Sequence, residues 1–346
     1  MAKKAKTFED CLDTYKEFIV NRGEERPFDP ISTGYTSIDV STGIGGLPRY
    51  RWSNIWGQKS SGKTTLALFI AKQVIDSGGS VLYIDVETGL DFLRIKEVVG
   101  EFEDGKFILI MPETSEQAFE IAEAGIESNG FDLIIFDSIG ALAPSKEKED
   151  EFTDANVALV SRQLGKFLRR NSNALKFSDK TAFLFINQIR ANIGVRYGDT
   201  ITQPGGFQIE HFLSLEIRLY SPKKVKKGTE ISGTTTKFVI SKNKCAIPFR
   251  TFELLIDFER GVDYCRDAIE FGLMLGVVDR KGSTYAFEDT SLGRGMDNSV
   301  EFLMENKEVL DKIKETCYNV VINKQVAIED IEEETKGEID ETDIGS

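Results

Sequence analysis

Residues Trp52-Ser-Asn-Ile-Trp56, followed by Gly57-Gln-Lys-Ser-Ser-Gly62-Lys63-Thr64, decide how this chain folds. The first part is a short apolar run typical of a buried strand, and a helical pattern of apolar residues opens at Thr64. The spacing between them is a complete G-x-x-x-x-G-K-[ST]. Glycines let backbone N–H groups wrap around phosphate oxygens, and the N-terminus of the next helix attracts negative charge. The stretch therefore predicts a nucleoside triphosphate site, with a glycine-rich turn as the alternative.

The predicted phosphate loop is a run of consecutive residues, Gly57, Gln58, Lys59, Ser60, Ser61, Gly62, Lys63, Thr64 and Thr65. We expect the Lys63 ammonium to reach the β- and γ-phosphates. The Thr64 hydroxyl is expected to ligate Mg²⁺.

A carboxylate follows each of two further strand-like runs. Leu133–Phe136 leads into Asp137, which we expect to hold the magnesium ion, directly or through water; a strand-end carboxylate capping a helix is the alternative. Val81–Val86 carries Asp85 and leads into Glu87. Carboxyl ends of strands in an α/β sheet face the ligand crevice. Glu87 is therefore the candidate for activating a hydrolytic water, although spacing alone allows Asp85 the same role.

A neutral amide ends a fourth run. Ala182–Ile186 is followed by Asn187 and Gln188. An amide at this edge of the sheet can sense the γ-phosphate without competing with Asp137 for the metal.

Strand-like and helical patterns alternate from about Ile31 to Lys242, which predicts an α/β fold with a mostly parallel, twisted sheet and helices on both faces. The expected strands are Trp52–Trp56, Val81–Val86, Phe107–Met111, Leu133–Phe136 and Ala182–Ile186, and the expected helices include Thr64–Asp76, Glu116–Glu127 and Val157–Arg170. After Phe212 three runs predict an antiparallel extension of the sheet: Ser214–Tyr220, Thr235–Ile240 and Phe252–Asp257.

The chain divides into four expected parts: a small N-terminal helix for subunit packing (1–30), a core (31–261), a small C-terminal α/β module (262–328) and an acidic disordered tail (329–346). Apolar residues at helical spacing between Phe8 and Ile19 indicate the N-terminal helix, which packs on its own core or on a neighbouring subunit. Two helices, Ala268–Leu275 and Val300–Ile322, are expected in the C-terminal module. The tail is either a solubilising segment or a DNA mimic that competes for a basic groove.

Composition narrows the class of protein. With 346 residues, 40% apolar and 29% charged, the chain has the make-up of a soluble globular protein. No run approaches the roughly 18 apolar residues that span a bilayer. Widely separated cysteines argue against a disulfide framework or a zinc ribbon and favour a cytoplasmic location. His211 is the only histidine, which excludes a multi-histidine metal site.

Two basic features suggest nucleic acid despite the net charge of −14. In Val157–Arg170 a basic stripe lies opposite an apolar one and suits a phosphate chain; it consists of Arg162, Lys166, Arg169 and Arg170. A solvated charged face is the alternative. The long, glycine-rich loop Ile189–Gly206 carries Arg190, Arg196, Gly205 and Gly206. Lys223, Lys224, Lys226 and Lys227 cluster at a predicted hairpin tip, as a solubilising edge or a weak second DNA site.

Seven segments, in this order and spacing, resemble the bacterial RecA recombinases and their phage-encoded relatives. They are Ile31–Gly34, Gly45–Pro48, Gly57–Thr65, Ile84–Glu87, Phe136–Pro144, Ile186–Arg190 and Lys242–Lys244. The resemblance implies a DNA-dependent ATPase, with ATP and Mg²⁺ at the subunit interface of a helical filament on single-stranded DNA. It also implies pairing with a homologous double-stranded DNA and strand exchange in recombination and repair.

The resemblance also implies roles for individual residues. Lys63 and Thr64 match the phosphate and magnesium positions, and Glu87 matches the catalytic glutamate. Gln188 matches the γ-phosphate sensor that leads into the second DNA loop, which contains Arg190, Arg196, Gly205 and Gly206. Asp91 matches an adenine contact, and Lys242 and Lys244 match a pair that reaches ATP on the adjacent subunit. The first DNA loop falls near Ser145–Asn156, where we place DNA contact at the C-terminal end and in the next helix.

Two other functions stay open. A hexameric helicase or regulatory ATPase of the same fold would form closed rings rather than filaments. A phosphotransferase acting on a small molecule would need an arginine-bearing lid and an acceptor pocket, and its ATP turnover would be indifferent to single-stranded DNA.

Overall fold

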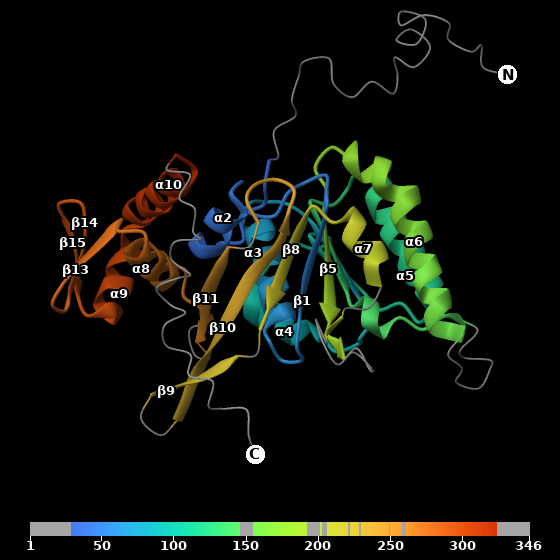
Figure 1. The fold of residues 1–346 in the computed structure, drawn as a ribbon, viewed down its shortest axis with the longest axis horizontal. Helices are drawn as coiled ribbons and strands as arrows, with labels where there is room; N and C mark the ends of the chain where they lie inside the picture. The colour runs from blue at the N-terminus through green and yellow to red at the C-terminus, as the bar shows by residue number, and fades with distance from the viewer. Residues whose placement is uncertain are drawn as a thin grey trace, which may run out of the picture.

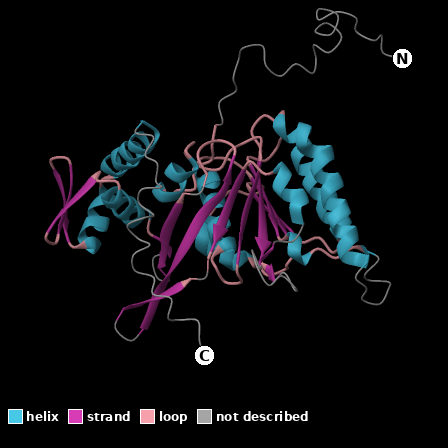
Figure 2. Ribbon diagram, viewed as in Figure 1, coloured by secondary structure: helices cyan, strands magenta, loops and turns pink. Residues whose placement is uncertain are grey.

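A ten-stranded sheet forms the centre of the molecule, with helices on its faces and a small module at one end (Figures 1 and 2). The computed structural model describes residues 29–145, 155–191, 201–202, 206–220, 222–227, 230–248, 250–257 and 261–323. The predicted N-terminal helix, apart from Asp29 and Pro30, and the acidic tail 329–346 lie outside these residues.

The strand order is β12-β11-β10-β8-β1-β5-β4-β2-β3, and β9 pairs with β10. The strands are β1 (Trp52–Gly57), β2 (Val81–Asp85), β3 (Phe107–Ile110), β4 (Leu133–Asp137), β5 (Ala182–Gln188), β8 (Leu215–Leu219), β9 (Lys223–Lys227), β10 (Glu230–Asn243), β11 (Thr251–Asp257) and β12 (Gly261–Val262). Six neighbouring strands, from β3 to β8, are parallel. The predicted fold class, α/β with a mostly parallel sheet, is confirmed.

Strand β8 differs from the prediction, which placed the run Ser214–Tyr220 in an antiparallel extension. It pairs in parallel with β1 and antiparallel with β10, so the antiparallel part begins only at β10. The physical reason is the short helix α7 (Gly206–Phe212), which lies between β5 and β8. A helix between two strands allows the crossover that parallel pairing requires, whereas β10 follows β8 without one.

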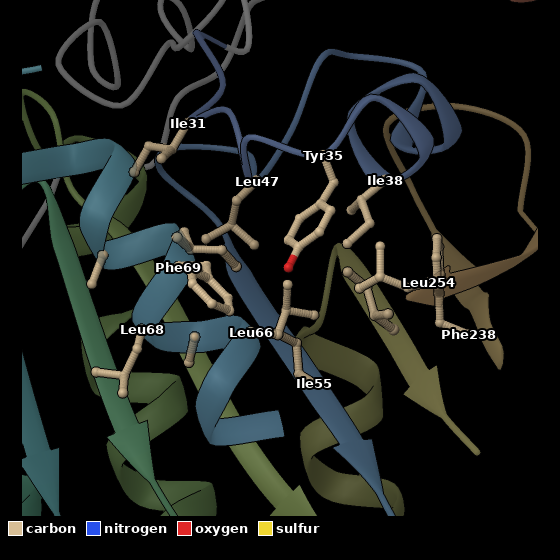
Figure 3. Close-up of a cluster of buried hydrophobic side chains, with 14 of the residues drawn as sticks. Ile31, Tyr35, Ile38, Leu47, Ile55, Leu66, Leu68, Phe69, Phe238 and Leu254 are labelled. Atoms are coloured by element: carbon tan, nitrogen blue, oxygen red, sulfur yellow. The ribbon is translucent and has the colours of Figure 1, made fainter. Parts of the chain in front are cut away.

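Two hydrophobic cores lie on opposite faces of the sheet, because side chains along each strand alternate between them. One face is covered by α2 (Thr36–Thr42), α3 (Lys63–Asp76) and α4 (Phe92–Val99), and the other by α5 (Ser115–Glu127), α6 (Ala155–Lys176) and α7. Figure 3 shows part of the first core, which includes Ile55 of β1, Leu66 and Phe69 of α3 and Phe238 of β10. The sequence prediction had not named α2, α4 and α7, which are short.

The C-terminal module contains a sheet as well as helices. It consists of α8 (Tyr264–Met274), β13 (Val278–Lys281), β14 (Thr284–Phe287), β15 (Thr290–Arg294), α9 (Met296–Glu305) and α10 (Lys307–Asn323). The predicted helix Val300–Ile322 is wrong, because the chain leaves helical geometry at Asn306, whose side-chain amide donates to the Phe302 carbonyl. The predicted α/β character of this module is confirmed. The positions of its three strands were not predicted, because β13 and β15 have mostly exposed side chains and no clean alternation.

A carboxylate joins this module to the core. The N-cap of α2 is Tyr35, whose side chain makes no capping bond. Asp267 of α8 supplies one instead, since its carboxylate accepts a 3.0 Å hydrogen bond from the Ser37 amide. The described helices include none with the length and apolar character that crossing a membrane would require.

Candidate functional site

The carboxyl ends of β1, β2, β4 and β5 lie together at one edge of the sheet. The register pairs Gly57 with Gln188 and Asp85 with Asp137. Parallel strands present these ends to one crevice. The phosphate loop therefore lies beside the predicted polar side chains of three other strands.

Backbone geometry explains the loop's composition. Gly57 packs so closely on β8 that a side-chain carbon there would lie 2.3 Å from the Leu219 carbonyl oxygen. Gly62 has a φ of 91°, which favours glycine. Lys63 is only 7% exposed, and its ammonium donates to the carbonyls of Gly57 (3.1 Å) and Gln58 (2.7 Å). Burial lowers the pKa of Lys63, while the nearby carboxylates of Asp137 and Glu87 oppose that shift.

Asp137 lies directly beneath the start of α3. Its oxygen Oδ2 accepts hydrogen bonds from the Thr64 hydroxyl (3.0 Å) and the Tyr83 hydroxyl (2.7 Å). Burial raises the pKa of Asp137 to about 6, and the charge of Glu87 adds to the shift, whereas both donors oppose it. The carboxylate and the hydroxyl predicted to hold magnesium are thus hydrogen-bonded neighbours.

These residues have the chemistry of a magnesium site. Mg²⁺ takes oxygen ligands and is usually held by one or two carboxylates plus phosphate oxygens and water, rather than by a cage of protein ligands. In the described part of the chain no cluster of three or more His, Cys, Asp or Glu side chains could hold a metal ion. One hydroxyl and one carboxylate beside a phosphate loop fit that preference.

Glu87 and Asp85 have different environments. The Glu87 oxygen Oε1 accepts hydrogen bonds from the Gln188 amide (2.6 Å) and the Ser138 hydroxyl (2.5 Å). Asp85 is 2% exposed, and its carboxylate accepts a bond from the Leu90 amide at 2.9 Å. Burial raises the pKa of Asp85. Asp85 therefore holds the turn after β2, while Glu87 is exposed and lies beside Gln188 at the end of β5.

Lys242 and Lys244 both contact the last turn of α7. The Lys242 ammonium donates to the Glu210 carbonyl, and the Lys244 ammonium donates to the His211 carbonyl at 2.9 Å. A cation suits the C-terminus of a helix, where backbone carbonyls lack partners.

Because α7 begins at Gly206, these bonds connect the lysine pair to the segment that follows the predicted second DNA loop. Partial burial, Lys242 and Arg51 lower the pKa of Lys244.

Asp91, the predicted adenine contact, is the N-cap of α4. Its carboxylate accepts a 2.7 Å hydrogen bond from the Arg94 amide, and the Arg94 guanidinium pairs with Glu97 at 3.2 Å. Both Asp91 and Arg94 are exposed.

The basic stripe predicted for nucleic acid lies on α6. Arg162, Lys166 and Arg169 are exposed, and the opposite stripe of the helix is buried in the second core. Arg170 differs from the other three, because its guanidinium pairs with Glu123 of α5 at 2.7 Å. The helix places three exposed cations along one side.

The predicted second DNA loop is described only in part. Arg190 belongs to the two-residue strand β6 (Arg190–Ala191), which pairs with β7 (Ile201–Thr202), so the loop begins and ends in a short hairpin. Gly206 is the first residue of α7. Arg196, Gly205 and the acidic part of the first loop, 146–151, lie outside the described residues. The lysine cluster runs along strand β9 and not only at a hairpin tip.

Tyr83 and Ser138 were not among the predicted site residues. A tyrosine inside an apolar run is typical of a core residue. Only the register of β2 against β4 brings the Tyr83 hydroxyl to Asp137. Ser138 directly follows Asp137, and that adjacency was the available signal.

The matching family models and curated relatives belong to one family and cover most of the chain. The family model of the RecA N-terminal domain matches residues 13–263, and that of the RecA C-terminal domain matches residues 266–321. Protein RecA of Bacillus subtilis is 37% identical over 87% of this chain and 86% of its own length. Protein RecA of Clostridium novyi is 36% identical over 86% of this chain and 85% of its own length. Among solved structures, the RadB recombinase matches 67% of this chain and 98% of its own, with a TM-score of 0.49 and 21% identity.

Proposed function

The chain belongs to the RecA family of recombinases, and from that premise we propose that it hydrolyses ATP while assembled as a helical filament on single-stranded DNA. The filament pairs its strand with a homologous double-stranded DNA and exchanges strands. The observation that carries the proposal is the meeting of Lys63, Asp137 and the Glu87–Gln188 pair at one edge of the sheet.

Each of these groups has a task in ATP hydrolysis. Lys63 exchanges its carbonyl partners for the β- and γ-phosphates. Thr64 and Asp137 would hold Mg²⁺, which would supply charge neutralisation for the phosphates. Glu87 accepts a proton from the attacking water, and Gln188 holds the Glu87 carboxylate until a γ-phosphate draws the amide away.

The nucleotide also joins two subunits. Lys242 and Lys244 leave the carbonyls of α7 and contact the phosphates of the ATP bound by the adjacent subunit. Because both lysines contact α7, their movement also affects the second DNA loop, which precedes this helix. Hydrolysis removes a phosphate that the lysines contact and thereby weakens the interface between subunits. Asp91 contacts the adenine.

DNA binds along the stripe of Arg162, Lys166 and Arg169 and at the second loop. Contacts of this kind with phosphates are independent of base sequence and weaken with salt. In this proposal residues 31–261 form the ATPase core, 262–328 a small C-terminal domain, and 1–30 a helix that packs against a neighbouring subunit. The place of action is the cytoplasm of a bacterial cell or of a phage-infected host.

ATP turnover with and without single-stranded DNA, imaged in parallel by electron microscopy, tests the proposal. We expect DNA to stimulate turnover and open helical filaments to form with ATP and magnesium. Lys63→Ala should abolish both, and Lys281→Ala, which removes an exposed lysine of β13 far from the phosphate loop in the sequence, should retain both. Closed rings, or turnover indifferent to DNA, would refute the proposal.

A further inference from the structure

Tyr83 is a core residue that carries a hydroxyl group. It lies in the middle of β2, is fully buried, and its ring stacks on Phe107 with centroids 6.2 Å apart. Its side chain points to the face of the sheet that α3 covers, as do the side chains of Val81 and Asp85. Ring packing alone would be served equally by phenylalanine, so the hydroxyl needs a separate explanation.

The hydroxyl is hydrogen-bonded to the carboxylate predicted to hold magnesium. Tyr83 is paired with Ile135 of β4, and Asp137 is the next residue on that face. A long side chain can reach a diagonal neighbour of this kind, and the Tyr83 O–H donates to Asp137 Oδ2 at 2.7 Å. Asp137 itself is 5% exposed, so water has little access to replace this donor.

Thr64 donates to the same oxygen, at 3.0 Å. A threonine hydroxyl has one proton and two lone pairs. Since the proton of Thr64 is directed to Asp137, its lone pairs remain for a cation. With Oδ2 engaged by two donors, Oδ1 is the carboxylate oxygen to which no described side chain donates. Tyr83 and Thr64 together fix the orientation of the carboxylate.

We propose that Tyr83 is a positioning residue for magnesium–nucleotide binding, because its hydroxyl holds the Asp137 carboxylate in the orientation that Thr64 and the cation share. The inference rests on the proposed function, in which Thr64 and Asp137 hold the metal. Outer groups that orient a ligand of a metal typically change metal affinity about 10- to 100-fold when removed. Tyr83 contributes to the affinity for Mg²⁺ and not to contacts with the nucleotide base.

The test uses the full-length protein with Tyr83→Phe, which keeps the ring on Phe107. The matched control is Tyr35→Phe, which removes another fully buried hydroxyl of the same core; among the described residues that hydroxyl has no hydrogen-bond partner. Binding of a fluorescent ATP analogue is titrated against Mg²⁺, and Mn²⁺ binding is followed by its paramagnetic resonance signal. We expect Tyr83→Phe to raise the half-saturating metal concentration about 10-fold, and Tyr35→Phe to leave it unchanged.

Two further results decide between positioning and packing. At saturating Mg²⁺ the Tyr83→Phe protein should regain nucleotide affinity and most of its turnover, and adding Tyr83→Phe to Asp137→Asn should change the metal dependence no further. A lowered melting temperature with unchanged metal dependence would overturn the inference and leave the proposed function intact. Nucleotide binding by the wild-type protein that ignores both Mg²⁺ and Lys63→Ala would overturn the proposed function, and the inference with it.

Discussion

The Gln188 amide donates a 2.6 Å hydrogen bond to Glu87 Oε1, so the predicted γ-phosphate sensor and the predicted base are in direct contact. The pair joins the ends of β5 and the segment after β2. A carboxylate whose oxygen already accepts two hydrogen bonds is a weaker proton acceptor for water. The contact thus couples the predicted sensor to the predicted base.

Glu87→Gln should mainly reduce turnover, whereas Asp85→Asn should mainly change stability. The first removes the proton acceptor, and we expect DNA-stimulated turnover to fall about 100-fold or more while nucleotide affinity is retained. The second keeps an oxygen for the Leu90 amide, so turnover should stay within a few-fold and the free energy of unfolding should change by about 1 kcal/mol. Steady-state hydrolysis, equilibrium nucleotide binding and urea unfolding measure these effects. Equal loss of turnover in both variants would contradict the assignment of the base to Glu87.

The α6 stripe predicts a graded salt dependence. Each phosphate contact contributes about −0.7 to the slope of log affinity against log salt for a single strand. Arg162→Gln, Lys166→Gln and Arg169→Gln should each reduce the steepness of the slope by about that amount, while Arg170→Gln should reduce it less because Glu123 already holds this guanidinium. Fluorescence anisotropy of a labelled oligo-dT across a salt series gives the slopes. If Arg170→Gln had the largest effect, the stripe would be placed on the wrong side of the helix.

Most of what the sequence could predict about the site concerned residues at the ends of strands. Asp137, Glu87 and Gln188 were predicted to lie together because each follows an apolar run, and in a parallel sheet the ends of such runs meet at one edge. Tyr83 was missed because its contact depends on the register of β2 against β4, which an apolar pattern does not specify.

The departures in the fold have similar causes. The direction of β8 was predicted wrongly because the seven-residue helix α7 was overlooked, and this helix permits a parallel crossover. The break at Asn306 was missed because apolar residues continue at helical spacing on both sides of it. Local patterns identified the elements that bury wide apolar faces, but not the short connections that set their direction.

Asp267 lies where the C-terminal module meets the core, and it makes the free energy of unfolding depend on pH. Burial raises the pKa of this carboxyl to about 6, although its bonds to Ser37 oppose the shift. Because the folded-state pKa lies above the unfolded one, the contribution to stability is fully present below pH about 4 and is lost as the pH rises through about 6. Asp267→Asn, which still offers an oxygen to the Ser37 amide, should remove this dependence.

The measurement is urea unfolding of wild type, Asp267→Asn and the exposed-site control Asp289→Asn between pH 4 and 7.5. Across that window the difference in unfolding free energy between wild type and Asp267→Asn should shift by about 2 kcal/mol, favouring wild type at the acid end. The control should follow wild type. Parallel profiles for wild type and Asp267→Asn would show that the carboxyl titrates alike in the folded and unfolded states.

The lysine pair allows a test of the shared ATP site by mixing two defective subunits. Lys63→Ala lacks the phosphate lysine but keeps Lys242 and Lys244, and Lys244→Ala keeps the phosphate loop but lacks one of the pair. Alone, the first should neither assemble nor turn over ATP, and the second should bind ATP without DNA-stimulated turnover. In a head-to-tail assembly of equal amounts, about a quarter of the interfaces combine two intact halves. Turnover should therefore reappear on mixing, in proportion to DNA. The control Lys72→Ala, which removes a partly buried lysine of α3 whose ammonium pairs with Asp76, should remain active alone. Two inactive proteins that stay inactive together would place Lys244 outside the neighbouring subunit's ATP site.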